Sequence, residues 1–292
     1  MRDVTPLPDL LHGQSRVGPV RDRRPVYVDL LPPCNSGCPA GENIQAWLAH
    51  TMAGRHEEAW RELVADNPLP AIHGRVCYHP CESVCNRANL DSAVSIHSVE
   101  RFLGDLALEQ GWQFSPPPAL SGKRVLVIGA GPSGLSAAYH LAKLGHEVEI
   151  RDSSAEPGGM MRYGIPAYRL PRDILDGELA RIEAMGVKMT CNHRVEDLAA
   201  EREAGRFDAV FVAVGAHLSK RVDIPARDAG PIVDAIAFLR SVASGEEPVI
   251  GRRVAVYGGG NTAMDAARTA RRLGAEETLI VYRRTREQMP AH

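Results

Sequence analysis

The sequence predicts an α/β fold in which a small helical domain is followed by two Rossmann-like dinucleotide-binding domains. Three observations lead to this prediction. A strand, a glycine-rich turn and an amphipathic helix follow one another twice, around Gly129 and around Gly258. The two copies keep one constant offset, which indicates an internal repeat. Five cysteines gather ahead of both copies, between residues 34 and 85, in a region whose apolar residues recur at helical spacing.

The bulk composition is that of an ordinary globular protein. The 292 residues are enough for more than one domain, and 44% of them are hydrophobic. A net charge of −2 gives no reason to expect nucleic acid or an anionic membrane as a partner. The sequence has no apolar run long enough to span a bilayer, and its start, MRDVTPLPDL, lacks an apolar signal core. We therefore expect a cytoplasmic protein, whose clustered thiols stay reduced and more often hold metal than form disulfides.

Composition divides the chain into five segments. Residues 1–33 are rich in proline and charge and are expected to form an extended arm. Residues 34–114 are expected to form the helical domain. The proline-rich residues 115–122 are expected to form a linker, because proline disrupts helix interiors. Residues 123–245 and 246–292 contain the first and the second glycine turn, and both of these domains are expected to be incomplete.

The first glycine turn is expected to bind FAD. Its glycines let the backbone approach a pyrophosphate at the positive N-terminus of the next helix. Asp152 ends the second strand, where a carboxylate can accept hydrogen bonds from the hydroxyls of an unphosphorylated ribose. A Gly158–Gly159 pair then lets backbone lie against the flavin, or forms only a loop, and residues 207–217 are predicted to form a buried strand. The residues predicted to bind this cofactor are Gly129, Gly131, Pro132, Ser133, Gly134, Asp152, Gly158, Gly159, Arg162 and Gly215.

The second glycine turn is expected to bind NADP(H). Its matching strand ends in VYRRTR, so Arg283 and Arg284 stand where the first copy has an acid. Guanidinium groups pair with the 2′-phosphate of NADPH, which a carboxylate would repel. The alternative is a solvated arginine run with no ligand. The residues predicted to bind this cofactor are Gly258, Gly260, Asn261, Thr262, Ala263, Arg283 and Arg284.

The clustered cysteines favour an iron–sulfur cluster over zinc or inert thiols. A structural zinc site more often shows two Cys-x-x-Cys pairs, and the sequence contains none. An iron–sulfur cluster needs thiolates that converge from several directions, with backbone amides near the sulfurs, and proline and glycine beside the ligands free such amides. Cys191 stands alone and is expected to be a small core residue. The nearby histidines, His73, His79 and His97, are not expected to be ligands.

Six motifs resemble a known family. They occur in order between residues 34 and 291: CNSGCPAGENIQAW, GRVCYHPCESVC, VLVIGAGPSGLSAA, GGMMRYGIPAYRLP, GGGNTAMDAARTA and VYRRTREQMPA. They are similar to the small subunit of bacterial glutamate synthase, the N-terminal half of dihydropyrimidine dehydrogenase and the large subunit of NADH-dependent ferredoxin:NADP oxidoreductase. The resemblance implies that NADPH or NADH passes hydride to FAD, and that single electrons leave through [4Fe-4S] clusters to a partner subunit or a ferredoxin-like protein.

The resemblance also implies a set of cluster ligands. The family's first cysteine motif has four thiols; here Val26 and Asp29 stand at the first two positions. If the family's ligands are transferred to the matching positions of this sequence, one [4Fe-4S] cluster keeps three thiols and takes a non-cysteine fourth ligand. A second cluster keeps only two thiols and is expected to be lost, unless one of these completes the first cluster. The thiols concerned are Cys38, Cys77 and Cys81 for the first cluster and Cys34 and Cys85 for the second.

Glu100 is the candidate for the fourth ligand. It lies four residues after Ile96 and three before Leu103, so it faces the buried side of its helix. Burying a carboxylate without a partner is costly, so Glu100 is expected to be a ligand, to orient a ligand, or to pair with a buried arginine.

The functional prediction is an electron-input oxidoreductase that passes hydride from NADPH to FAD and single electrons onward through the cluster. The chain ends at QMPAH, before a further flavin-binding segment of the family, so we expect a fragment or a truncated product. The alternatives are a non-catalytic iron–sulfur and nucleotide-binding scaffold subunit, and a zinc-stabilised nucleotide-binding protein.

Overall fold

The computed structural model describes residues 2–3, 26–27, 31–117, 119–218 and 232–291. Most of the predicted arm, including Asp29, lies outside these residues. Within the arm, β1 (Arg2–Asp3) pairs antiparallel with β2 (Val26–Tyr27). In the described part of the chain, no helix is both long and apolar enough to cross a bilayer.

The helical domain consists of short helices packed around two tryptophans. Its elements are α1 (Pro33–Gly37), α2 (Ile44–Met52), α3 (His56–Leu63), α4 (Pro70–Val76), α5 (Pro80–Ser83), η1 (Asn86–Asn89) and α6 (Ile96–Gln110). Proline begins α1, α4 and α5. The first N–H groups of a helix have no carbonyl partner within the helix, so the missing N–H of proline costs no hydrogen bond there. Trp47 and Trp60 are fully buried, as the helical spacing of the apolar residues predicts.

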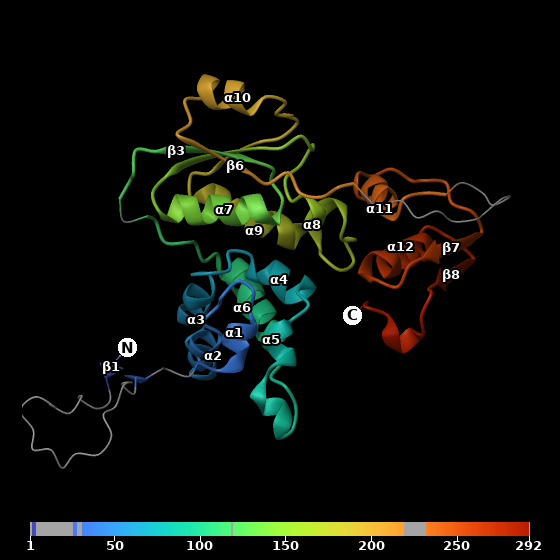
Figure 1. The fold of residues 1–292 in the computed structure, drawn as a ribbon, viewed down its shortest axis with the longest axis horizontal. Coiled ribbons are helices and arrows are strands. Elements are labelled where there is room, and N and C mark those ends of the chain that lie inside the picture. Colours follow the sequence, from blue (N-terminus) through green and yellow to red (C-terminus); the bar gives the residue numbers. More distant parts are fainter. Residues whose placement is uncertain (1, 4–25, 28–30, 118, 219–231, 292) are drawn as a thin grey trace, which may run out of the picture.

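The first nucleotide-binding domain is built on a four-stranded parallel sheet with the order β5-β4-β3-β6. Its elements are β3 (Arg124–Ile128), α7 (Pro132–Lys143), β4 (Glu147–Arg151), α8 (Met160–Tyr163), α9 (Arg172–Ala184), β5 (Lys188–Thr190), α10 (Leu198–Ala204) and β6 (Ala209–Val212). Figure 1 shows α7 and α9 between this sheet and the helical domain, with α10 on the opposite side.

The prediction of a buried strand over residues 207–217 is wrong in part. The strand β6 covers only Ala209–Val212, and within the described residues it pairs with β3 alone. It is therefore an edge strand, and the side chains of Phe211 and Val212 are exposed. A continuous apolar run cannot distinguish an edge strand from a central one, because that difference depends on the neighbours.

The helical domain and the first nucleotide-binding domain share one hydrophobic core. Trp60, Ile72 and Phe114 from the helical side belong to the same buried cluster as Leu135 of α7 and Leu175 of α9. The linker begins directly after Phe114, whose ring stacks on Trp60 and meets Tyr139 edge-on. The helical domain is therefore fixed against the helices that follow the first glycine turn.

The second nucleotide-binding domain contains a two-stranded parallel sheet covered by helices. Its elements are α11 (Ala235–Ala243), β7 (Arg253–Tyr257), α12 (Asn261–Arg272), β8 (Glu277–Val281) and η2 (Arg286–Gln288). Phe238 of α11 packs on the core formed by Val256, Ala263 and Ala266. The predicted boundary at residue 245 would assign α11 to the first domain, and the domain limits stay predictions.

Candidate cofactor and cluster sites

The first glycine turn connects β3 to α7 at the carboxyl edge of the sheet. Gly129 has a φ of +110°, and a Cβ there would lie 2.3 Å from the carbonyl oxygen of Ala213. A Cβ on Gly134 would lie 1.9 Å from the carbonyl oxygen of Gly129. Both positions therefore require glycine, and α7 begins at Pro132 and Ser133 with its N-terminal amides at the turn.

Asp152 supports this turn from the end of β4. Its Oδ2 accepts a hydrogen bond of 2.7 Å from the amide of Ala130, and its Oδ1 accepts one of 2.6 Å from the amide of Ser154. Each carboxylate oxygen has a second lone pair, so the group can also accept hydrogen bonds from a ribose hydroxyl. The position fits the predicted role of an acid at an adenosine ribose.

The Gly158–Gly159 pair lies directly against the first glycine turn. The amide of Gly158 donates a 2.8 Å hydrogen bond to the carbonyl of Ala130. A Cβ on Gly159 would lie 2.7 Å from the Cα of Gly131, so only glycine allows this approach. Gly215, with a φ of +71°, follows β6 at the same edge. A backbone-lined surface of this kind fits a dinucleotide, whose pyrophosphate needs close main-chain contact.

Arg162 lies beneath the Gly158–Gly159 pair rather than at an open surface. Its side chain is 6% exposed, and its Nε donates a 2.6 Å hydrogen bond to the carbonyl oxygen of Pro157. The guanidinium also pairs with Asp176. These contacts hold the shape of the glycine loop, so a direct contact between Arg162 and a cofactor stays a prediction.

The second glycine turn repeats this geometry between β7 and α12. Gly258 has a φ of +146°, and its amide donates a 2.9 Å hydrogen bond to the carbonyl oxygen of Val281 at the end of β8. Nothing lies within 4 Å of a Cβ built on Gly260, which leaves open space above the start of α12. The helix begins with Asn261 and Thr262, and Ala263 is buried below them.

Arg283 and Arg284 lie just past the end of β8, and both are exposed. Within the described part of the chain, neither side chain makes a hydrogen bond or an ion pair, whereas Arg252 and Arg253 of the same domain pair with Glu276 and Glu277. The two guanidinium groups are therefore available to an anion next to the second turn.

The five clustered cysteines form two groups by proximity. Burial, together with the neighbouring Cys38, Glu82 and Cys77, raises the pKa of the Cys81 thiol to about 12. Burial also raises the pKa of the Cys34 thiol, with a smaller contribution from the neighbouring Cys85. The structure thus brings Cys38 and Cys77 each near Cys81, and Cys34 near Cys85.

The spacing of the thiols argues against a single zinc ion. Among the described residues, no three cysteines place their sulfurs within 4.8 Å of one another. Four thiolates around one zinc ion would lie roughly 3.8 Å apart, because each Zn–S bond is about 2.3 Å. The amide of His79 donates a 3.3 Å hydrogen bond to Sγ of Cys77, the kind of contact that tunes the potential of iron–sulfur clusters.

Glu100 is buried and belongs to a polar network that the sequence analysis missed. The side-chain amide of Asn67 donates to Glu100 at 2.7 Å and to Glu42 at 2.9 Å, while its oxygen lies 2.7 Å from Nδ1 of His73. Burial raises the pKa of Glu42 to about 7 and raises that of Glu100 well above its ordinary value. Glu100 also raises the pKa of Cys77, so its carboxylate lies close to that thiol. That Glu100 is the fourth ligand of the cluster stays a prediction.

The network left only weak signals in the sequence. Asn67 stands before Pro68, in a sequence that indicates a turn, and Glu42 directly follows the glycine of CPAG. Neither pattern reveals that the two residues are 2% and 5% exposed. Their burial follows only from the packing of α2, α4 and α6.

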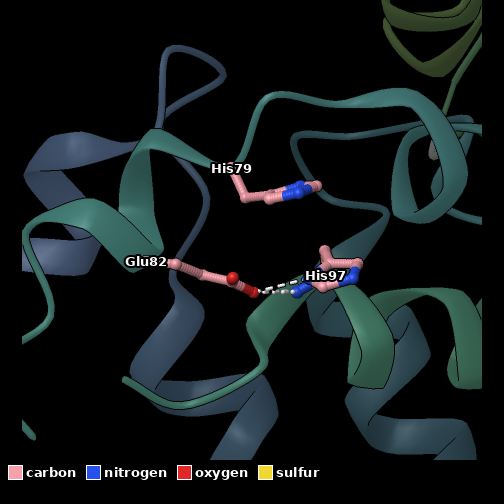
Figure 2. A group of neighbouring side chains, drawn as sticks. All are labelled: His79, Glu82 and His97. Atoms are coloured by element: carbon pink, nitrogen blue, oxygen red, sulfur yellow. Dashed lines mark hydrogen bonds and ion pairs between the residues drawn. The ribbon is translucent and has the colours of Figure 1, made fainter. Parts of the chain in front are cut away.

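Two of the histidines form a small cluster with a glutamate, shown in Figure 2. The rings of His79 and His97 are stacked, with centroids 4.0 Å apart, and Oε1 of Glu82 lies 2.7 Å from Nδ1 of His97. One ligand atom from each of the three residues lies within 4.8 Å of the others, a spacing that could hold a metal ion. This cluster therefore joins the start of α5 to the start of α6.

Cys191, the sixth cysteine, follows β5. It is half-buried rather than fully buried, and burial raises the pKa of its thiol, with Asp152 as a further contributor. It thus lies near the first glycine turn and not with the thiols of the helical domain.

Comparison with known proteins identifies the family. Residues 123–291, more than half of the chain, match the family model described as pyridine nucleotide-disulphide oxidoreductase. Residues 30–112 match the model described as dihydropyrimidine dehydrogenase domain II, 4Fe-4S cluster. The chain therefore belongs to the pyridine nucleotide-disulphide oxidoreductase family and carries an iron–sulfur domain ahead of it.

Three relatives show the likeness along the chain. The NADP(+)-dependent formate dehydrogenase subunit beta of Moorella thermoacetica is 41% identical, and the match covers 89% of this chain and 40% of that protein. The NADPH-Fe(3+) oxidoreductase subunit beta of Geobacter sulfurreducens is 40% identical, with the same coverage of 89% and 40%. The glutamate synthase [NADPH] small chain of Azospirillum brasilense is 36% identical, covering 89% of this chain and 58% of that one. The chain thus spans about two fifths of the first two relatives.

These matches confirm the family predicted from the motifs, and with it the α/β fold class and the class of oxidoreductase. They also confirm the predicted cofactor classes, FAD, NADP(H) and a [4Fe-4S] cluster. The residues that hold each cofactor stay predictions.

Proposed function

We propose that this chain is the electron-input unit of an NADPH-dependent oxidoreductase. It would take a hydride from NADPH onto FAD and pass single electrons through a [4Fe-4S] cluster to a partner. The observation that carries this proposal is the difference between the two glycine turns. One turn lies beside the carboxylate of Asp152 and the other beside the exposed guanidinium groups of Arg283 and Arg284.

The protein residues would bind and orient the cofactors. FAD, when bound, accepts two electrons as a hydride and can release them singly, which no side chain can do. Asp152 would accept hydrogen bonds from the ribose of FAD, and the N-terminal amides of α7 would face its pyrophosphate. Arg283 and Arg284 would pair with the 2′-phosphate of NADPH. This placement needs no acid or base from the chain.

The cluster would be held by Cys38, Cys77 and Cys81, with Glu100 as the fourth ligand. The hydrogen bonds from Asn67 would fix the orientation of the Glu100 carboxylate. Cys34 and Cys85 would form the remnant of a second site. Because thiolates bind iron, the raised thiol pKa values imply that loading the cluster releases protons.

The acceptor would be a partner subunit or a ferredoxin-like protein. Two of the relatives are named as beta subunits and one as a small chain, which supports a partner without identifying it. We expect the protein in the cytoplasm, where the thiols of the cluster stay reduced before iron is loaded.

The test is the double substitution of Arg283→Ala and Arg284→Ala. Each charge-assisted hydrogen bond contributes roughly 1.5–3 kcal/mol, so the KM for NADPH should rise at least about tenfold while that for NADH changes little. The measurement is the rate of flavin bleaching with each nucleotide. Arg252→Ala, an exposed arginine already paired with Glu276, is the matched control. An unchanged preference for NADPH would show that these arginines do not read the phosphate.

A further inference from the structure

Three side chains between α5 and α6 have the composition of a metal site. His79 directly precedes α5, Glu82 lies within it, and His97 lies in the first turn of α6. Figure 2 shows the ring of His79 above that of His97, with the carboxylate of Glu82 pointing at the edge of His97. In the part of the chain that the structure describes, no other three histidine, cysteine, aspartate or glutamate side chains are grouped this closely.

The distances within this group are close to those around a bound zinc ion. Oε1 of Glu82 lies 2.7 Å from Nδ1 of His97, and the two ring centroids are 4.0 Å apart. Ligand atoms around a tetrahedral zinc ion lie about 3.3 Å apart, because each Zn–N bond is about 2.0–2.1 Å. An ion would therefore draw the three ligand atoms together from at most 4.8 Å to about 3.3 Å. The rings, now 17° from parallel, would tilt toward the ion, and His97 has room to do so because its side chain is 33% exposed.

The backbone already holds two of the three side chains in place. Oε1 of Glu82 accepts a 2.9 Å hydrogen bond from the amide of His97, which anchors the carboxylate at the N-terminus of α6. His79 has a φ of +44°, a left-handed conformation that is uncommon for a residue with a Cβ. Its amide donates to Sγ of Cys77 while its ring stacks on that of His97. The backbone of His79 therefore belongs to the cysteine motif, and its side chain belongs to this group.

Two imidazoles and one carboxylate form a donor set that is typical of zinc and of other divalent transition metals. Thiolates are softer donors and suit iron–sulfur clusters, so the group differs in chemistry from the five clustered cysteines. Three protein ligands also leave a fourth position for water. The sequence did not indicate this group, because η1 and its flanking loop separate His79 from His97.

The segment between these ligands is largely exposed. Residues 86–95, which include η1, contain no fully buried side chain, and Leu90 is 84% exposed. A segment with so little burial opens easily, and closing its ends with a bound ion stabilises it. An ion held by Glu82 and His97 would close this loop at its base. It would also fix α5, which carries Cys81, against α6.

We propose that His79, Glu82 and His97 form a metal site separate from the iron–sulfur cluster, which binds a divalent transition metal such as Zn²⁺ and closes the loop between α5 and α6. The site does not rest on the proposed electron transfer, because no step of that transfer passes through it. Its role is structural.

The first experiment measures zinc binding by the full chain. The protein is loaded anaerobically with its iron–sulfur cluster, so that the cluster thiols are occupied, and is then incubated with equimolar Zn²⁺ and desalted. We expect about one retained zinc ion per chain, with nitrogen and oxygen but no sulfur in its X-ray absorption spectrum. His97→Gln keeps the amide that anchors Glu82 and should weaken binding at least roughly tenfold. Glu82→Gln removes the charged ligand and should do the same.

His193→Gln is the matched control. His193 is also partly exposed and also pairs with a glutamate, since its Nε2 lies 3.0 Å from Glu201. It belongs to no group of three such side chains within the described residues. This variant should therefore bind zinc as the wild type does.

The second experiment follows amide hydrogen exchange in residues 86–97 with and without Zn²⁺. Zinc should slow exchange there in the wild type and in His193→Gln, and should have no effect in His97→Gln, because a ligand stabilises the state that it binds. An ion pair between Glu82 and His97 without a metal predicts no such difference.

Each result bears on one part of the proposal. Failure of the wild type to retain zinc, zinc with sulfur ligands, or equal binding by His97→Gln and His193→Gln would overturn the site. Retained zinc with nitrogen and oxygen ligands that leaves exchange in residues 86–97 unchanged would overturn its structural role.

Discussion

Single atoms decide whether the two glycine turns can form. At Gly134 an added methyl carbon would lie 1.9 Å from a backbone oxygen, which no small shift can relieve. At Gly260, with a φ of −93°, the same carbon would meet nothing within 4 Å. The two glycines therefore serve different needs. Gly134 lets the chain pack against itself, whereas Gly260 keeps space open above the helix.

Gly134→Ala and Gly260→Ala should consequently fail in different ways. We expect Gly134→Ala to destabilise the fold by about 1–3 kcal/mol, because backbone must move to admit the methyl group. Gly260→Ala should leave the unfolding midpoint almost unchanged but weaken NADPH binding, since the methyl group would occupy the space for the pyrophosphate. Thermal unfolding and nucleotide titration of both variants check this. Equal loss of stability in the two variants would contradict it.

At the residue scale, the local backbone geometry of the glycine turns could be predicted from the sequence better than the burial and the partners of individual side chains. Gly129, Asp152 and Gly258 lie where the dinucleotide-binding pattern predicts, because that pattern encodes local backbone geometry. The role of Asn67 could not be predicted, since it depends on partners far away in the chain. Arg162 shows the same limit, because its burial beneath a loop has no signature in the motif.

Short helices determine which thiols meet. Cys34 lies in α1 and Cys38 directly follows it, yet Cys38 is a neighbour of Cys81 while Cys34 is a neighbour of Cys85. The helices α1 and α5 pack closely, and a Cβ on Gly37 would lie 2.6 Å from a methyl group of Val84. One turn of helix thus separates two groups of thiols that are close in sequence.

Cys38→Ser and Cys34→Ser form a matched pair for this division. Cys38→Ser should lose most of the iron and sulfide, because it removes one of three thiolates from the surviving cluster. Cys34→Ser should retain both at the wild-type level. The measurement is iron and acid-labile sulfide per chain after anaerobic purification. Equal loss in both variants would mean that Cys34 completes the cluster.

At the scale of elements, periodicity predicted the helices and the parallel strands, whereas their limits and neighbours required the structure. The apolar run of β3 is buried as expected, but the similar run around β6 lies at an edge of the described sheet. Periodicity also gave no reason to group α11 with the second domain, because its contact with Val256 and Ala263 joins residues that are distant in sequence.

At the scale of the whole molecule, a buried carboxylate connects the helical domain to the first nucleotide-binding domain. Glu178 of α9 is fully buried, accepts a 2.8 Å hydrogen bond from the amide of Ala71 in α4, and lies 3.0 Å from Arg181. Burial raises the pKa of Glu178 to about 7, despite the opposing effect of Arg181. The contact between these two domains therefore changes its charge near neutral pH.

The stability of this contact should fall as the pH rises. Because the folded-state pKa of about 7 exceeds the ordinary value of 4.5, the folded protein binds this proton more tightly than the unfolded chain. The resulting stabilisation is complete below pH 4.5 and is lost by about pH 7, a change of about 3 kcal/mol. Glu178→Gln should remove it, whereas Glu203→Gln, on the surface of α10, should not. Denaturant unfolding at pH 5 and pH 8 gives the comparison, and identical pH dependence in both variants would refute the assignment.

The continuous core beneath Trp60 and Leu175 has a consequence for protein engineering. Cutting the chain at the proline-rich linker, in order to express the iron–sulfur domain separately, would expose aromatic side chains on both fragments. The thiol-bearing part and its nucleotide-binding neighbour should therefore be transplanted together. Recombination between related genes should therefore tolerate a crossover near residue 117 poorly.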